Sequence, residues 1–577
     1  MENKYHYSAE RNVQMVLYLL KANNIKKVIA SPGATNVSIV ASMQQDPFFE
    51  MYSCVDERSA GYMAVGMSEE SGEPVVLSCT GATSARNYMP ALTEAYYRKL
   101  PIIAITSTQD ETHIGHLIAQ VTDRSQQPKD LVIESVHIQN IRSNNDEWDC
   151  CIKINKALQS IRPIPGPVHI NLATGMGGGY DVMELPATKL IRKYIDGDKL
   201  PELKTEGHIA IFIGSHHAFN NEETESIDKF CSTYNAVVFC DHTSSYKGKY
   251  RFMYSLVGAQ DFMDYDISQI ELLIHLGEIS GDYDTLRKLI IKKVWRVSPD
   301  GEFRDTFKGK LENVFAITEK AFFDYYSKDG IAQEDDYLKE CQSVYYSLLN
   351  NFGEIPFSNI YVASKLSKCI PDNSVLYLGI LNTLRSWNYF EVSDSIHTVC
   401  NVGGFGIDGI LSSLIGASIS HPERFHFGIV GDLSFFYDMN SIGNRHIGKN
   451  LRIIVINNGH GQEFQMYNHG ASFLGEDVNK FVAAEGHFGK MSVNLVKHYS
   501  EDLGYKYLSA TNKMEFENAL KIFVDITVNK SIIFEVFTNN IDENSALNLS
   551  RTIETDKAKI AKRLLKNIVK NKIIRRK

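Results

Sequence analysis

Apolar segments of strand length alternate with amphipathic segments of helix length along most of this 577-residue chain. In the first part of the chain, the spacing predicts a helix over residues 9–24 and strands over 27–30, 74–79, 101–106 and 168–171. Strands that alternate with helices form parallel sheets, because a parallel connection needs a helical crossover to bring the chain back. We therefore predict an α/β protein with doubly wound parallel sheets.

Chain length and two charged stretches divide this pattern into three units. A chain of this length exceeds what one hydrophobic core organises, and residues 189–206 and 325–345 are charged enough to be linkers. The later predicted strands are 209–214, 237–240, 270–276 and 294–297 in the second unit, and 375–378, 426–430, 452–456 and 531–537 in the third. We predict domains at residues 1–187, 188–345 and 346–554, followed by a basic tail at 555–577.

Composition excludes several classes of protein. The net charge of −9 is spread widely and gives no reason to expect nucleic-acid binding. No run of 18 apolar residues occurs, and the N-terminus lacks the pattern of a secretory signal. The nine cysteines are scattered without a C-x-x-C pair, as expected for reduced thiols in the cytoplasm.

The C-terminal tail has a different composition. Residues 557–577 contain ten Lys or Arg residues and no acid, and Ile560, Leu564 and Ile568 recur at helical spacing. One interpretation is a solvated terminal helix. The other is an amphipathic helix that contacts an anionic membrane surface or a protein partner.

Two polar clusters in the third unit each follow a predicted strand. One strand ends at Gly431-Asp432, and the next ends at Asn457-Asn458. Open α/β sheets bind ligands at the carboxyl ends of their strands. Asp432 offers a carboxylate oxygen and Asn458 an amide oxygen, both of which bind Mg²⁺, while nearby glycines leave backbone N–H groups free for a diphosphate. Two unrelated polar loops are the structural alternative.

The first unit contains a second cluster. Glu57 begins a predicted helix, and about twenty residues later Thr80-Gly81-Ala82 follows a predicted strand. A Glu in the first turn of a helix is also favourable with the helix dipole, so a purely structural role is the alternative.

Together these motifs resemble the thiamine-diphosphate-dependent enzymes. In these enzymes Gly-Asp and Asn-Asn, about two dozen residues apart, hold the metal and the diphosphate. A glutamate followed by Thr-Gly belongs to their pyrimidine-binding domain, where it activates the cofactor. The stretches 431–440, 406–409 and 534–537 are similar to SEPHCHC synthase, the family member of menaquinone biosynthesis, and the resemblance covers nearly the whole chain. It implies pyrimidine-binding, central and diphosphate-binding domains, in that order.

The resemblance assigns roles residue by residue. Asp432, Asn458 and the His460 carbonyl correspond to the Mg²⁺ ligands. Ile407 resembles the apolar residue that holds the cofactor bent, although a single apolar residue is more often simply core. The cofactor-binding residues implied are Glu57, Thr80, Gly81, Asn401, Gly406, Ile407, Gly431, Asp432, Leu433, Ser434, Asn458, His460 and Gly461.

The predicted catalytic residues are Glu57, Gln120, Glu463 and His460. Glu57 would activate the cofactor, and Gln120 resembles a glutamine that contacts the substrate-derived carbonyl. Glu463 and His460 are polar groups near the expected site that can relay protons, and Glu463 lies close to where decarboxylases of the superfamily have a Glu. A structural role for His460 is the alternative.

The chain departs from the family where substrate carboxylates bind. Basic residues are expected after the first strand, in the central domain and after Asn401. The chain instead has residues 31–35, residues 280–283 and Val402, none of which is basic, and only Arg385 can supply one such charge. We therefore predict that the cofactor half of the site is retained and the acceptor half is altered.

These observations lead to a functional hypothesis. We predict decarboxylation of a 2-oxo acid with transfer to an acceptor, dependent on thiamine diphosphate and Mg²⁺, for example in specialised sugar or polysaccharide metabolism. A simple 2-oxo acid decarboxylase, an authentic SEPHCHC synthase and a non-catalytic binding protein are the alternatives. The resemblance also implies a homodimer or homotetramer in the cytoplasm.

Overall fold

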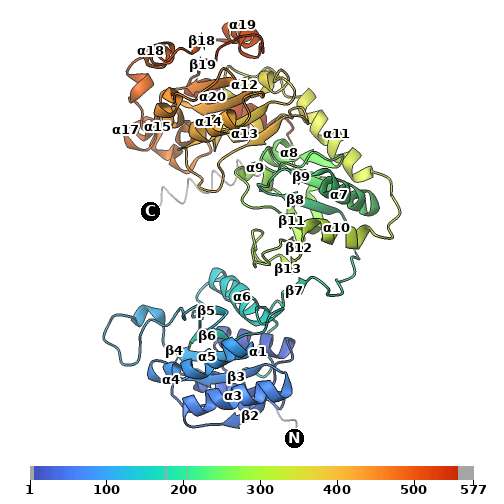
Figure 1. Cartoon of the computed structure of the whole chain (residues 1–577), viewed down its shortest axis with the longest axis vertical. Coiled ribbons are helices and arrows are strands. Elements are labelled where there is room, and N and C mark those ends of the chain that lie inside the picture. The colour runs from blue at the N-terminus through green and yellow to red at the C-terminus, as the bar shows by residue number, and fades with distance from the viewer. Residues whose placement is uncertain (1–5, 176–178, 205, 556–577) are drawn as a thin grey trace. The chain divides into compact units, whose positions relative to one another are not determined.

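The computed structural model describes residues 6–175, 179–204 and 206–555, so the predicted tail at 555–577 lies outside the described residues except for Thr555. The chain forms three parallel sheets with flanking helices (Figure 1). It divides into two compact units, Met1–Pro201 with Lys293–Thr318, and Glu202–Lys292 with Glu319–Lys577. The predicted α/β class is confirmed. None of the described helices is long and apolar enough to cross a membrane.

The first sheet has the strand order β2-β1-β3-β4-β6-β5. Its strands are β1 (Lys27–Ala30), β2 (Glu50–Ser53), β3 (Val75–Cys79), β4 (Ile102–Thr108), β5 (Glu134–Ile138) and β6 (Val168–Ala173). Its helices are α1 (Arg11–Ala22), α2 (Val37–Gln45), α3 (Glu57–Ser71), α4 (Thr83–Asn87), α5 (Met89–Arg98) and α6 (Asn144–Gln159). The four strands and the first helix predicted here are all present.

Successive apolar side chains along each strand point to opposite faces, which explains why helices cover both faces of this sheet. Val76 and Ile103 pack in the core formed with α1, α2 and α6, whereas Leu77 and Ala104 pack in the core formed with α3 and α5. Successive residues of a strand point to opposite faces, so fully apolar strands require cover on both sides. The sheet is therefore doubly wound, as predicted.

The second sheet has the strand order β10-β9-β8-β11-β12-β13-β7. Its strands are β7 (Arg192–Ile195), β8 (Ile209–Ile213), β9 (Val237–Cys240), β10 (Arg251–Met253), β11 (Gln269–Leu276), β12 (Ile290–Val297) and β13 (Leu311–Ala316). The helices that accompany it along the chain are α7 (Asn221–Tyr234), α8 (Ser255–Ala259), α9 (Tyr283–Leu286), α10 (Glu319–Ser327) and α11 (Asp336–Asn350). The segment 189–206, predicted as a linker, contains β7, which pairs with β13.

The third sheet has the strand order β15-β14-β16-β17-β19-β18. Its strands are β14 (Val375–Leu378), β15 (His397–Val399), β16 (His426–Gly431), β17 (Leu451–Asn457), β18 (Lys506–Ala510) and β19 (Ile532–Phe537). Its helices are α12 (Asn359–Leu366), α13 (Asn382–Trp387), α14 (Ile410–Ser420), α15 (Asp432–Asp438), α16 (Gln462–Gln465), α17 (Val478–Phe481), α18 (Leu495–Asp502), α19 (Lys513–Phe523) and α20 (Asn540–Arg551).

The first and third sheets share one topology. Replacing β1–β6 by β14–β19 in chain order converts one strand order into the other. In each sheet the winding direction reverses between the first and third strands, β1 and β3 or β14 and β16. A reversal of this kind opens a crevice at the carboxyl ends of the strands, where open α/β sheets bind ligands.

Candidate active site

Asp432 occupies the crevice of the third sheet. It begins α15 directly after β16, and its carboxylate accepts hydrogen bonds from the backbone N–H groups of Leu433 (2.8 Å) and Gly459 (2.7 Å). Asp432 is only 4% exposed, and burial raises the pKa of its carboxyl to about 7. A cation bound against this carboxylate would offset the cost of burying its charge.

The loop after β17 carries the other predicted oxygen ligands, Asn458 and the His460 carbonyl. The Asn458 Oδ1 atom accepts a hydrogen bond from the backbone N–H of His460 (3.4 Å), and the Gly461 N–H donates to the Ala483 carbonyl (2.6 Å). The His460 Nε2 atom lies 2.8 Å from Oε1 of Gln462, and burial lowers the pKa of the imidazole. His460 is therefore a neutral side chain held by its neighbour.

One cavity of about 120 Å³ joins the ends of β14, β16 and β17. The predicted residues that line it are Ile407, Gly431, Asp432, Leu433, Ser434, Asn458, His460, Gly461 and Glu463. Ile407 therefore faces the cavity and is not simply core, and its carbonyl accepts a hydrogen bond from the Ser434 hydroxyl (2.5 Å). These residues come from three loops that are distant in sequence and adjacent in the sheet.

This site fits a divalent metal and a diphosphate. Asp432 and Asn458 contribute a carboxylate and an amide oxygen, and Mg²⁺ binds proteins through a few oxygen ligands of this type. No described atom lies within 4 Å of the position that a Cβ on Gly431 would take, so open space adjoins the backbone there. A phosphate group can approach such a backbone closely.

Arg385 and Glu463 form the strongest charge pair at this cavity. The Arg385 Nη2 atom donates to both carboxylate oxygens of Glu463, at 2.8 and 2.9 Å. The two side chains are 12% and 19% exposed, and the Glu463 charge raises the pKa of Arg385 against the effect of its burial. Arg385 is thus paired with a carboxylate of the chain itself, on the cavity-lining residue Glu463.

Acidic residues occupy the place where the family resemblance implies basic ones. Asp282 is 3% exposed, and burial, followed by the nearby Asp284 charge, raises the pKa of its carboxyl to about 6. Asp282 accepts a hydrogen bond from the Asn388 side chain (3.1 Å), while Asp284 pairs with Arg551 (3.1 Å). This stretch therefore serves internal packing against the third sheet's domain.

A second buried acid, Glu543, lies behind the cavity wall, and no sequence motif predicted it. The backbone N–H of Asn359, which lines the cavity, donates to Oε1 of Glu543 (2.9 Å), and its side-chain amide donates to Thr383 (3.0 Å). Burial raises the pKa of the Glu543 carboxyl to about 7. The contact joins residues 184 positions apart, which no local motif reports.

The first unit holds the other predicted cofactor residues. Glu57 is half-buried at the start of α3, where Asp56 caps the helix by accepting from the Ser59 N–H (3.0 Å) and the Asn87 amide donates to Glu57 (3.4 Å). Thr80 and Gly81 follow β3 at the switch point of the first sheet. Glu57 thus begins the helix after β2, and Thr80 and Gly81 lie in the loop after β3.

Besides Glu57, Thr80 and Gly81, three further predicted residues are absent from the cavity lining. Gln120 is exposed in a loop next to Leu117, with a left-handed φ of 65°. Asn401 donates to the Ser413 hydroxyl (3.1 Å), and Gly406 directly precedes Ile407. Their proposed contacts with cofactor or substrate stay predictions.

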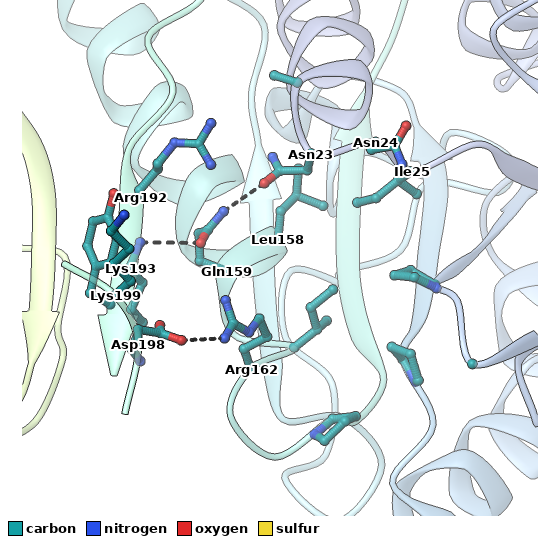
Figure 2. A pocket seen from close by; sticks show the side chains of 17 residues that line it. Asn23, Asn24, Ile25, Leu158, Gln159, Arg162, Arg192, Lys193, Asp198 and Lys199 are labelled. Atoms are coloured by element: carbon teal, nitrogen blue, oxygen red, sulfur yellow. Dashed lines mark hydrogen bonds and ion pairs between the residues drawn. The ribbon is translucent and has the colours of Figure 1, made fainter. Parts of the chain in front are cut away.

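A larger cavity, of about 750 Å³, lies on the first unit and contains none of the predicted site residues (Figure 2). Its lining includes Arg162, Arg192, Lys193 and Lys199, and Arg162 pairs with Asp198 at 2.9 Å. It borders the residues that precede β3 and β4, the opposite end of the strands from Thr80 and Gly81.

Comparisons with known proteins identify relatives of this chain. Residues 11–130 match the family model described as thiamine pyrophosphate enzyme, N-terminal TPP binding domain. The chain is 28% identical to 2-succinyl-5-enolpyruvyl-6-hydroxy-3-cyclohexene-1-carboxylate synthase (SEPHCHC synthase) of Bacteroides fragilis, covering 92% of this chain and 97% of the relative. The Phocaeicola vulgatus enzyme of that name is also 28% identical, covering 94% and 98%. The chain is therefore a thiamine-diphosphate-dependent enzyme of the superfamily that includes the SEPHCHC synthases.

Proposed function

We propose that this enzyme decarboxylates a 2-oxo acid and joins the remaining fragment to an acceptor, with thiamine diphosphate and Mg²⁺ as cofactors. The observation that carries the proposal is the cavity in which Asp432, Asn458 and Glu463 converge at the switch point of the third sheet. Metal-ligand oxygens and a carboxylate able to move protons lie around one small volume. When bound, thiamine diphosphate supplies the carbanion chemistry that bond cleavage beside a carbonyl requires.

Different residues would bind the metal, the diphosphate and the rest of the cofactor. Asp432, Asn458 and the His460 carbonyl would hold Mg²⁺, and the N–H groups of the loop that begins at Gly431 would bind the diphosphate. Glu57 would hold a proton at the aminopyrimidine N1′ atom. Ile407 would support the cofactor and exclude water.

Glu463 would deliver or remove the proton at the substrate-derived group. Arg385 positions its carboxylate through two hydrogen bonds, at 2.8 and 2.9 Å, so the acid is held in one orientation. General acid–base catalysis depends on such positioning, because a proton moves only across hydrogen-bond distance. The neutral, hydrogen-bonded imidazole of His460 favours a supporting role for that residue.

The acceptor is expected to differ from that of the named relatives. Their name specifies a cyclohexene carboxylate product, and such a product calls for cationic groups to bind carboxylates. Here Arg385 is paired with Glu463, and residues 280–283 contribute a buried acid, Asp282. We propose an acceptor with fewer carboxylates, used by a homodimer or homotetramer in the cytoplasm.

The test is incubation of the holoenzyme with a panel of 2-oxo acids, with and without aldehyde, sugar and activated-alkene acceptors. Products are identified by mass spectrometry and CO₂ release is measured. A product that contains both donor and acceptor supports the proposal. Free aldehyde under every condition would instead establish a simple decarboxylase, and consumption of 2-oxoglutarate with isochorismate would establish SEPHCHC synthase activity.

A further inference from the structure

Arg124 is a buried arginine in the first unit with no partner for its side chain. It is 5% exposed, and none of its three guanidinium nitrogens forms a hydrogen bond with the described residues. Burial lowers the pKa of the Arg124 guanidinium. The neighbouring Cys79 raises this pKa, and the charge of Arg86 lowers it. A buried guanidinium without a counter-charge is costly, and proteins normally pair it with an anion.

Among the described residues, no carboxylate acts on the Arg124 charge. The thiol of Cys79 has a pKa of about 12, so it is neutral, and Arg86 is a second cation. The nearby imidazole of His169 is also neutral, because burial and the Arg124 charge lower its pKa to about 3. The missing counter-charge therefore has to come from outside this group of residues.

Arg124 lies at the ligand-binding edge of the first sheet. A Cβ on Gly81 would stand only 2.5 Å from the Arg124 Nη2 atom, which places the guanidinium directly against the turn after β3. Ser31, Cys79 and Tyr88 are buried together near the ends of β1 and β3, where their hydroxyl and thiol groups interact with one another and offer no charge to the guanidinium. The unmet donors of the Arg124 guanidinium thus lie at the switch point, where sheets of this type bind ligands.

The chain segment that carries Arg124 has the length of a functional loop. Residues 109–133 connect β4 to β5 and contain only one turn of 3₁₀ helix, at Glu111–His113. Loops of this length without regular structure inside a compact domain are usually binding loops or lids.

We propose that Arg124 binds a small oxyanion, a carboxylate or a phosphate group, at the carboxyl edge of the first sheet beside the Thr80-Gly81 turn. A guanidinium presents parallel N–H donors that match the two oxygens of such a group. Arg124 belongs to the first unit, whereas the predicted metal and diphosphate ligands belong to the third sheet. It does not require the proposed reaction, although a substrate carboxylate would be one natural ligand.

Binding of oxyanions to the protein saturated with thiamine diphosphate and Mg²⁺ tests the proposal. Sodium succinate and sodium phosphate are titrated calorimetrically and in thermal melts, with sodium chloride at equal ionic strength as the reference. We expect one of them to bind saturably, and Arg124→Met to weaken this binding about ten- to hundredfold, as loss of a charge-assisted hydrogen bond does. Preference for succinate or phosphate identifies the anion.

Two further variants control the test. Arg192→Met removes a cation from the basic cavity of Figure 2 and should leave the affinity unchanged. Arg124→Lys keeps the charge without the two-pronged geometry and should bind with intermediate affinity. Without anion, Arg124→Met should melt at or above the wild-type temperature, because it removes an unpaired buried charge.

Three results would overturn the proposal. They are absence of saturable binding to the wild-type protein, loss of binding in Arg192→Met but not in Arg124→Met, and a large fall in the melting temperature of anion-free Arg124→Met. None of these measurements needs turnover. An enzyme that decarboxylates no 2-oxo acid would refute the proposed function and leave this test intact.

Discussion

Replacing Glu463 by Gln isolates the function of the ion pair with Arg385. The substitution keeps the size of the side chain and removes its negative charge, so the Arg385 guanidinium loses its partner. Breaking a fully buried pair costs about 3–5 kcal/mol. Since the two side chains are 12% and 19% exposed, water screens part of this cost, and we expect about 2–3 kcal/mol of destabilisation.

A double-mutant cycle separates the pair from its surroundings. Glu463→Gln, Arg385→Met and the double variant are unfolded in urea, and their midpoints are compared with that of the wild type. We expect the double variant to be destabilised by less than the sum of the two single variants, with a coupling of about 2 kcal/mol, because it leaves no charge unpaired.

The same variant tests catalysis. If Glu463 moves a proton, Glu463→Gln should lower kcat by about 10²–10⁴-fold while KM changes little. Strictly additive stability effects together with an unchanged kcat would refute our reasoning about both the pair and its role. Lys365→Met, at an exposed ion pair with Glu517, is a matched control that should change neither quantity appreciably.

Three other outcomes are expected. Glu57→Gln should reduce kcat by at least about 10²-fold while calorimetry shows cofactor affinity within about tenfold of the wild type, since general acid–base function is lost and most contacts remain; unchanged turnover would contradict the role of Glu57. Asp432→Asn should weaken cofactor binding about ten- to hundredfold and abolish its dependence on Mg²⁺, as titrations with and without EDTA would reveal, whereas persistent Mg²⁺ dependence would place the metal elsewhere. The buried imidazoles of His169 and His242 have pKa values of about 3, so they stay neutral in the folded protein while the unfolded chain takes up protons below about pH 6.5. Stability should therefore fall as the pH drops, by about 2 kcal/mol per imidazole at pH 5. Melting temperatures at pH 7.5 and 5.0 measure this effect, and His242→Gln should reduce the difference; an equal difference in the variant would contradict it.

Sequence patterns were sufficient to predict those features that depend on neighbouring residues in the chain, such as strands and the loops that follow them. Each strand predicted in the first and third units is present, because buried parallel strands are continuous apolar runs. The loops at Asp432 and Asn458 were placed correctly at strand ends for the same reason, and neighbouring parallel strands then bring them to one cavity. Local pattern and sheet topology together determine this part of the site.

Long-range pairing could not be inferred in the same way. Arg385 and Glu463 are 78 residues apart, and the sequence around one residue gives no indication that it pairs with the other. The same holds for Arg124, which no sequence motif marked and which is buried against Gly81 in the structure. Burial of a charged residue depends on which loops fold over it, and sequence periodicity carries no such information.

The strand β7 is synthesised well before the strand with which it pairs. It lies at one edge of the second sheet, and its sole strand neighbour there, β13, is joined to it by the pairing of Arg192 with Asn313. A ribosome adding about 5–20 residues per second needs roughly 6–24 s to make the intervening stretch of some 120 residues. During that interval β7 has emerged without its neighbour. The charged side chains of β7 disfavour its pairing with strands of other chains during this interval. The same charges that made this segment resemble a linker in the sequence therefore reduce the risk of aggregation during synthesis.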